Sequence, residues 1–290
     1  DNGDTLKTEK FTLEYKDPKY NWTKLRQGNL EILYHDLPHE KVHKILDNVD
    51  PQLQAAKKLF GLQEIQLLKA VIVNGRNEAE RSFPHLSDKA TRGHIFGGFA
   101  FDNHNLFISQ GLNRNTIAHE ITHLLLGQAI YSPMARVPAW LNEGLAMHFE
   151  IDSRSRTYRI EKLAHQGRLL KLRAMGAIPG KPNDIDIFYA QSWSLVDFMI
   201  RTYGEDRMYN LVAAINRGHK IEDAISYAYG FNIDQLETEW KNYVVPSNDK
   251  NSGNKHNTLH VLSGLFIITL IGIAILTWPL PLRLIRIRDS

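Results

Sequence analysis

The apolar positions in the first part of the chain predict short strands with two helices between them. Short segments whose side chains alternate, or are continuously apolar and β-branched, are typical of strands. Two intervening stretches have helical spacing, and Pro51 suits the first position of the second helix. We therefore expect strands at residues 11–15, 30–34 and 67–73, a strand pair within 94–109 that turns at 102–105, and helices at 39–48 and 51–60.

From residue 115 onward the apolar pattern is mainly helical. A run of strands followed by a run of helices is the signature of an α+β fold. We expect an N-terminal mixed β-sheet with helices and a C-terminal helical lobe. The predicted helices of the second part are 115–126, 138–150, 158–172, 188–203, 207–217, 221–229 and 233–243.

The last fifth of the chain predicts a membrane anchor. Residues 257–282 contain no Asp, Glu, Lys or Arg, and residues 261–280 are almost wholly aliphatic. At about 1.5 Å per residue, roughly 20 apolar residues cross a hydrocarbon core of about 30 Å. A buried core helix would show a polar stripe, which this segment lacks. We expect one transmembrane helix at residues 258–281.

The charges beside this helix predict its orientation. The basic tail at 282–290 holds three arginines, whereas the linker at 246–257 is polar with partly offset charges. The positive-inside rule then places the tail in the cytoplasm and the domain at residues 1–245 outside the cell membrane, in a single-pass arrangement. Because the chain starts at Asp1 and not at Met, we expect that a signal peptide was removed or that the sequence is a fragment.

Charge and cysteine content exclude several classes of protein. The whole chain carries 35 Lys and Arg against 32 Asp and Glu, a net charge of +3. Three arginines and one aspartate lie in residues 258–290, which leaves 32 basic and 31 acidic residues in the rest. A nearly neutral domain lacks the basic face of a nucleic-acid binder. With no cysteine, a disulfide framework, a thiolate zinc site and a thiol nucleophile are also excluded.

The pattern His-Glu-x-x-His occurs twice, at residues 39–43 and 119–123. On a helix, two histidines four residues apart share one face, so both imidazoles can reach a single zinc ion while the intervening Glu lies beside it. The first copy lies in a charged stretch whose apolar positions form an ordinary core stripe. We expect it to be a surface amphipathic helix without a metal.

The second copy has the layout of a functional site. At about 100° per residue, His119 and His123 share one face of the helix, and the apolar residues around them occupy the opposite face. Glu143 follows twenty residues after His123. A hydrolytic zinc needs three protein ligands and one open position, and two histidines with one carboxylate meet that need. A second helix that runs back past the first would bring Glu143 to the histidines.

These motifs resemble the gluzincin zinc metallopeptidases, specifically the peptidase MA-like group. The likeness rests on Ala-His-Glu-Ile-Thr-His at 118–123, on the spacing to Glu143 and on Trp-Leu-Asn-Glu-Gly-Leu-Ala at 140–146, and it extends over residues 28–244. By this resemblance the helix with the second copy is a zincin active-site helix, His119, His123 and Glu143 bind Zn²⁺, and Glu120 is the general base.

The chain also departs from the pattern of that family. Gly-x-Met-Glu-Asn, which holds the substrate amine in related aminopeptidases, is absent. Met147 stands where many gluzincins place an acidic residue that orients a ligand histidine. For Glu150 two interpretations stay open: it orients a ligand histidine in place of residue 147, or it is a solvated surface acid. Tyr189 is a candidate donor to the oxyanion, although an aromatic residue there also suits the core. Gly97 and Gly98 mark either a bulge or an edge where an extended peptide pairs as an added strand.

We therefore expect a membrane-anchored zinc metalloprotease that hydrolyses peptide bonds with a zinc-activated water and Glu120 as general base. Its expected partners are a peptide or protein substrate and the lipid bilayer around the C-terminal helix. Two alternatives stay open. One is a membrane-tethered binding module that keeps the fold without catalysis, and the other is a zinc hydrolase that acts on a non-peptide bond.

Overall fold

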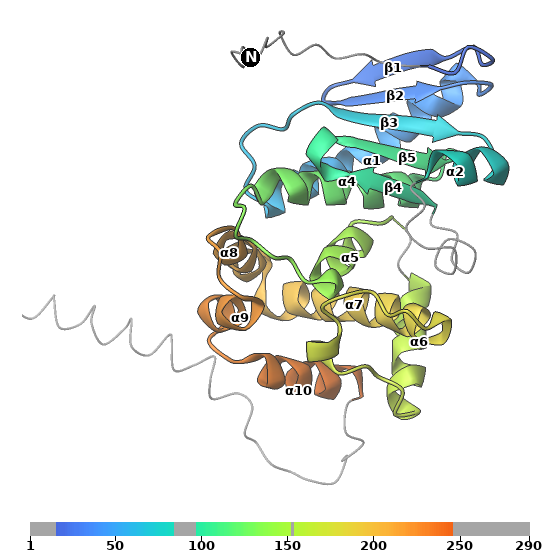
Figure 1. The fold of residues 1–290 in the computed structure, drawn as a ribbon. Helices are drawn as coiled ribbons and strands as arrows, with labels where there is room; N and C mark the ends of the chain where they lie inside the picture. The colour runs from blue at the N-terminus through green and yellow to red at the C-terminus, as the bar shows by residue number, and fades with distance from the viewer. Residues whose placement is uncertain (1–15, 84–96, 152–153, 246–290) are drawn as a thin grey trace, which may run out of the picture. The chain divides into compact units, whose positions relative to one another are not determined.

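The computed structural model describes residues 16–83, 97–151 and 154–245, all of which belong to one compact unit of the chain (Figure 1). Its first part holds a mixed sheet of five strands in the order β1-β2-β3-β5-β4. The outer pairs are antiparallel and the two inner pairs are parallel. The strands are β1 (Thr23–Gln27), β2 (Leu30–Tyr34), β3 (Leu68–Val73), β4 (Gly98–Phe101) and β5 (Leu106–Gln110).

Side-chain alternation explains the predicted strands of this sheet. Leu30, Ile32 and Tyr34 of β2 are buried, whereas the residues between them are half-buried. The tight connection to β1 passes through Gly28, whose φ of 57° favours glycine. Strand β1 was not expected, because its five residues are exposed or half-buried and show no apolar run. The predicted strand at 11–15 lies outside the described residues.

One long helix, α1 (His39–Leu59), replaces the two helices expected at 39–48 and 51–60. The expectation of a break at Pro51 is wrong, since this proline lies inside the helix. A proline there removes one backbone hydrogen bond. Packing of the helix offsets this loss, because the buried stripe continues through the proline at the same three-to-four residue spacing. The stripe consists of Val42, Leu46, Val49, Leu53, Ala56 and Leu59.

Helix α4 (Arg114–Ala129) links the sheet to the helical part of the molecule. It contacts β4, β5 and α1 on one side and α5 (Ala139–His148) on the other (Figure 1). A short helix, α2 (Arg76–Ser82), which the sequence did not predict, follows β3. The expected strand pair is confirmed as β4 and β5, which are joined by the 3₁₀ turn η1 (Asp102–His104).

The remaining helices form the predicted C-terminal helical part, below the sheet in Figure 1. Helix α5 packs along α7, the longest of them. Helix α7 starts at Pro182 and not at residue 188 as expected, because proline is well suited to the first turn of a helix. Helix α6 ends at His165, before the left-handed Gly167, and not at residue 172. The helices after α5 are α6 (Arg154–His165), α7 (Pro182–Tyr203), α8 (Glu205–Asn216), α9 (Ile221–Tyr229) and α10 (Ile233–Val244), with the turn η2 (Leu172–Ala174) between α6 and α7.

These elements confirm the α+β class, with an N-terminal mixed sheet and a helical C-terminal part. The structure does not test the predicted transmembrane helix at 258–281, because that segment lies outside the described residues. Within residues 16–83, 97–151 and 154–245, no helix has the length and apolar character that a membrane span requires.

Candidate metal centre and active site

Helix α4 is positioned by its cap and by its buried face. The Asn113 side chain accepts hydrogen bonds from the backbone N–H groups of Asn115 and Thr116, at 2.9 and 3.2 Å, which satisfies two free donors of the first turn. Ile117, Ile121 and Leu125 are fully buried. The helix therefore has one fixed orientation, in which the imidazoles of His119 and His123 point toward α5.

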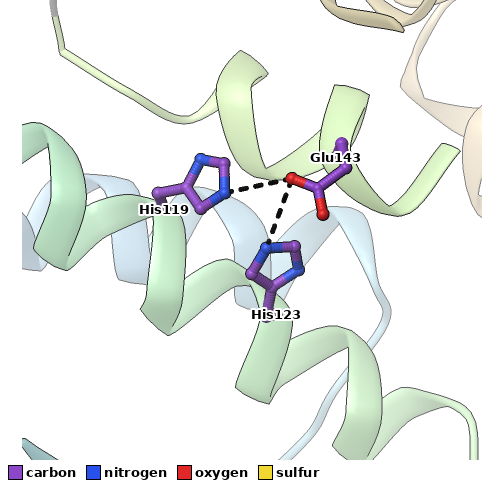
Figure 2. Close-up of side chains that lie close together, drawn as sticks. All are labelled: His119, His123 and Glu143. Atoms are coloured by element: carbon purple, nitrogen blue, oxygen red, sulfur yellow. Dashed lines mark ion pairs between the residues drawn. The ribbon is translucent and has the colours of Figure 1, made fainter. Parts of the chain in front are cut away.

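The two histidines and Glu143 converge as the sequence predicted (Figure 2). Oε2 of Glu143 lies 3.3 Å from Nε2 of His119 and 3.8 Å from Nε2 of His123. Their potential ligand atoms all lie within 4.8 Å of one another, and each side chain is at most 16% exposed. Two imidazole nitrogens and one carboxylate oxygen are a donor set that zinc accepts. The residues present therefore fit a divalent metal ion.

In this cluster, burial and the close pairing of histidine with glutamate shift the pKa values in opposite directions. Burial lowers the pKa of His119, but the hydrogen bonds to Glu143 and Glu150 outweigh it and raise the pKa to about 10. Burial raises the pKa of Glu143, but the two histidines lower it by more, so the net effect is a pKa below the ordinary value. Without a metal, the cluster therefore pairs an imidazolium with a carboxylate. A bound metal needs the neutral imidazole, so metal binding releases this proton.

Each histidine is also held from its other ring nitrogen. Nδ1 of His119 lies 2.8 Å from Oε1 of Glu150, and Nδ1 of His123 lies 2.9 Å from Oδ1 of Asn142. Because both partners are acceptors, the proton of each neutral ring belongs on Nδ1 and the lone pair of Nε2 faces the cluster. Of the two alternatives for Glu150, the contact with His119 is the one observed. Asn142 was not predicted from the sequence as a partner of His123, although it directly precedes Glu143.

Glu120 lies under the edge strand of the sheet. It is 6% exposed, and a Cβ placed on Gly98 would lie 2.8 Å from both Cγ and Oε1 of its side chain. Burial raises the pKa of Glu120, an effect that His119 and His123 partly offset. A Cβ on Gly97 would likewise lie 2.7 Å from Oγ1 of Thr116. The two glycines thus let the start of β4 approach α4 closely. This close approach explains physically why glycine stands at both positions, a question that the sequence did not decide.

A cavity of about 280 Å³ connects these groups. Tyr189 of α7 lies in its wall together with Glu120 and Glu143. Burial and the charges of both glutamates raise the pKa of Tyr189, so its phenol keeps its proton and can donate a hydrogen bond. The complete lining is Gly98, Phe99, Ala100, Asp102, His119, Glu120, His123, Asn142, Glu143, Ile178 and Tyr189. Asp102 and Ile178 were not predicted from the sequence.

The first His-Glu-x-x-His copy is an exposed face of α1, as expected. His39, Glu40 and His43 are exposed, whereas Val42 and Leu46 are buried. Nδ1 of His39 is bonded to the hydroxyl of Tyr34 at 2.7 Å, and Nδ1 of His43 pairs with Asp47 at 3.3 Å. Among the residues that the structure describes, the single group of histidines and acids arranged to hold a metal ion is the second copy with Glu143.

Comparison with known protein families locates the same region. The family model described as the Peptidase MA superfamily matches residues 93–246, more than half of the chain. The match includes α4 and α5, which carry the three converging side chains, and leaves out the first copy of the motif. A comparison with curated proteins finds no match.

Proposed function

Since the chain belongs to the Peptidase MA superfamily, we propose that it is a membrane-anchored zinc metallopeptidase that hydrolyses peptide bonds. One observation carries the proposal. Nε2 of His119, Nε2 of His123 and Oε2 of Glu143 converge in the wall of a cavity that also holds the buried carboxylate of Glu120. Three ligands and a neighbouring carboxylate are what a hydrolytic zinc site needs.

The chemistry of the donor set supports zinc. In this proposal His119, His123 and Glu143 hold the ion, while Glu150 and Asn142 fix the two rings from Nδ1. When bound, the ion supplies Lewis acidity, which polarises a substrate carbonyl and makes water a better nucleophile at neutral pH. A site without thiolates also agrees with a chain that has no cysteine.

Glu120 is the proposed general base. Its carboxylate takes one proton from the attacking water while the hydroxyl adds to the carbonyl carbon, and then delivers that proton to the amide nitrogen as the C–N bond breaks. Burial favours this role, because it raises the pKa of Glu120 toward the working pH. Tyr189 is the proposed donor to the developing oxyanion, since its phenol lies in the same cavity and keeps its proton.

The edge of the sheet is the proposed place for the substrate backbone. Strand β4 is the last strand in the sheet order, so one of its sides has no strand partner among the described residues, and Gly98, Phe99 and Ala100 line the cavity. An extended peptide bonds to such an edge as an added strand. This proposal places the scissile bond between β4 and the groups of α4 and α5.

Membrane attachment is the part of the proposal that rests on sequence alone. The aliphatic run at residues 261–280 and the three arginines beyond it support one transmembrane helix, a cytoplasmic tail and an extracytoplasmic peptidase domain. Protease protection of the intact chain in right-side-out and inverted vesicles tests this orientation. Cleavage of the domain from the cytoplasmic side would contradict it.

Peptide cleavage by the full-length chain in detergent tests the proposed activity. We expect the zinc-loaded chain to cleave members of a broad peptide library, a chelator to stop cleavage, and zinc to restore it. Glu120→Gln should retain zinc and lose roughly a hundredfold or more in rate, because the general base is removed. Gln54→Glu, a change on the exposed face of α1, is a charge control that should cleave like the wild type.

The alternatives give different results in the same assay. A binding module without catalysis would hold zinc and cleave nothing, while still capturing peptides. A hydrolase of another bond would leave every peptide intact and cleave ester, phosphate or glycoside reporters in a manner that needs Glu120. Either result overturns the proposed peptidase activity.

A further inference from the structure

The charge of the cavity is unbalanced. Three carboxylates line it, those of Asp102, Glu120 and Glu143, and among the lining residues that the structure describes there is no lysine or arginine. A divalent ion held by neutral histidines balances two of these negative charges. Glu143 would bind the ion and Glu120 would act as the base beside it, so Asp102 would carry the negative charge that the ion leaves unbalanced.

The turn that carries Asp102 is fixed by a ring of three amide side chains. Asn105, which ends the turn with a left-handed φ of 49°, donates from its backbone N–H to the Asp102 carbonyl at 3.2 Å. Its side chain donates to Oε1 of Gln66 at 2.8 Å and accepts from Nε2 of Gln128 at 2.8 Å. Oε1 of Gln128 in turn accepts from the backbone N–H of Gln66 at 3.0 Å. The turn that carries Asp102 is thus anchored to α4 through Gln128 and to the segment before β3 through Gln66.

Close contact with α4 also fixes the stem of Asp102. A Cβ placed on Gly127 would lie 3.0 Å from the Asp102 Cβ, so the helix backbone and this side chain are nearly in contact. Yet the carboxylate itself makes no ion pair, and no hydrogen bond to another side chain, within the described part of the chain. Asp102 is thus an exposed carboxylate in the wall of the cavity, fixed at its backbone and stem and without an ion pair in the described part of the chain, and such a group can receive a cation.

We propose that Asp102 is a specificity-determining residue that selects substrates with a cationic group, either an ammonium or a guanidinium, next to the scissile bond. The inference rests on the proposed peptidase function and specifies its substrate class. The Asp102 carboxylate accepts hydrogen bonds from the cation, which supplies a positive charge that the described lining of the cavity lacks. Two sources have this chemistry, a Lys or Arg side chain and the free N-terminal amine of a peptide.

Matched peptides test this selection with the full-length, zinc-loaded chain. Each peptide carries Arg, Lys, Gln or norleucine at one position near the cleaved bond, with its N-terminus either free or acetylated. Wild type, Asp102→Asn and the control Asp223→Asn are compared by their kcat/KM ratios for cationic over neutral peptides, after bound zinc is measured in each. Asp223 is an exposed acid of α9 outside the cavity, and its loss changes the net charge equally.

We expect wild type and Asp223→Asn to prefer the cationic peptide roughly tenfold, the scale of one charge-assisted hydrogen bond, and Asp102→Asn to lose this preference. A preference for the free N-terminus that acetylation removes identifies the amine as the cation, and one that survives acetylation identifies the side chain. Equal ratios in wild type and Asp102→Asn would overturn the proposal.

A binding measurement separates this inference from the proposed activity. In the Glu120→Gln background, calorimetry should show tighter binding of the cationic peptide than of its neutral isostere, and the difference should vanish with Asp102→Asn and weaken at high salt. If the wild type cleaves no peptide, the proposed activity fails while this titration still decides the role of Asp102. Equal binding of both peptides to the Glu120→Gln protein would contradict it.

Discussion

Nδ1 of His119 lies 2.8 Å from Oε1 of Glu150, which is only 11% exposed and follows the end of α5. Glu150 stands seven residues after Glu143, about two helical turns further along the chain. Met147, where the resembled family places its acid, is buried in the core instead. In this chain the carboxylate that contacts the first histidine therefore comes from position 150 and not from position 147.

Removal of this contact should weaken metal binding. With Glu150→Ala we expect zinc affinity to fall roughly 10- to 100-fold, because the His119 ring loses the acceptor that fixes its orientation. Glu150→Gln keeps an oxygen acceptor and should lose less. Competition with a chromophoric chelator measures both. The matched control is Glu40→Gln in the first motif copy, and a fall in affinity as large as that of Glu150→Ala would contradict the assignment.

Gly98→Ala should slow catalysis without releasing the metal. The added methyl group would lie 2.8 Å from the Glu120 side chain, so the carboxylate must shift, and a misplacement of about 1 Å costs up to roughly a hundredfold in rate. Steady-state cleavage and bound zinc are measured together. Gly180→Ala is the control, since a Cβ at Gly180 meets nothing within 4 Å. Unchanged kcat in Gly98→Ala would show that catalysis does not depend on the present position of the Glu120 carboxylate.

Tyr189→Phe should lower kcat while zinc content and KM stay near the wild-type values. An oxyanion donor acts mainly in the transition state, and loss of one such donor costs roughly 100- to 1,000-fold. Tyr131→Phe, an exposed tyrosine outside the cavity, removes a hydroxyl without this effect. Equal kcat for both variants would contradict the proposed oxyanion contact and would show that Tyr189 serves packing only.

Stability should depend on pH through His35, which is far in sequence from the proposed metal ligands. His35 is 2% exposed, and its two ring nitrogens lie 2.8 Å from Asp36 and 2.9 Å from Glu78. Burial lowers the pKa of His35, but these two carboxylates outweigh it and raise the pKa above its ordinary value of 6.5. Because the folded pKa is the higher one, the charged ring stabilises the fold fully below pH 6.5, and this contribution is lost as pH rises through the folded pKa.

Urea unfolding of wild type and His35→Gln at a series of pH values measures this contribution. We expect the difference in the free energy of unfolding to be largest near pH 6 and to shrink toward pH 9, with about 1.4 kcal/mol for each unit by which the two pKa values differ. Glu78→Gln removes one of the partners and should reduce the same slope. Parallel curves for wild type and His35→Gln would contradict the prediction.

Much of the candidate metal site was predictable from sequence because helical geometry is local. The four-residue spacing of His119 and His123 puts both rings on one face of any helix, and the twenty-residue spacing from His123 to Glu143 leaves room for a loop and a return helix. The same helical geometry distinguished the two copies of the His-Glu-x-x-His motif. The copy at 39–43 has a charged environment and an ordinary core stripe, and the structure shows it as an exposed face.

The rest of the site depends on contacts that single-sequence reasoning does not reach. Asp102 enters the cavity only because β4 and β5 close a hairpin against α4, and Asn142 reaches His123 only through the packing of α5. The break expected at Pro51 fails for the same kind of reason, since a continuous buried stripe keeps α1 intact across it. Local rules thus predicted the convergence of His119, His123 and Glu143, and tertiary packing decides which side chains contact them.

Bound zinc per chain tests the central claim most directly. Wild type, His123→Ala and the matched control His43→Ala, which removes the equivalent histidine of the first motif copy, are saturated with zinc, dialysed and analysed by atomic absorption. We predict one zinc per chain in wild type and in His43→Ala, and none or nearly none in His123→Ala. Undiminished zinc in His123→Ala, or loss of zinc in His43→Ala alone, would contradict the account.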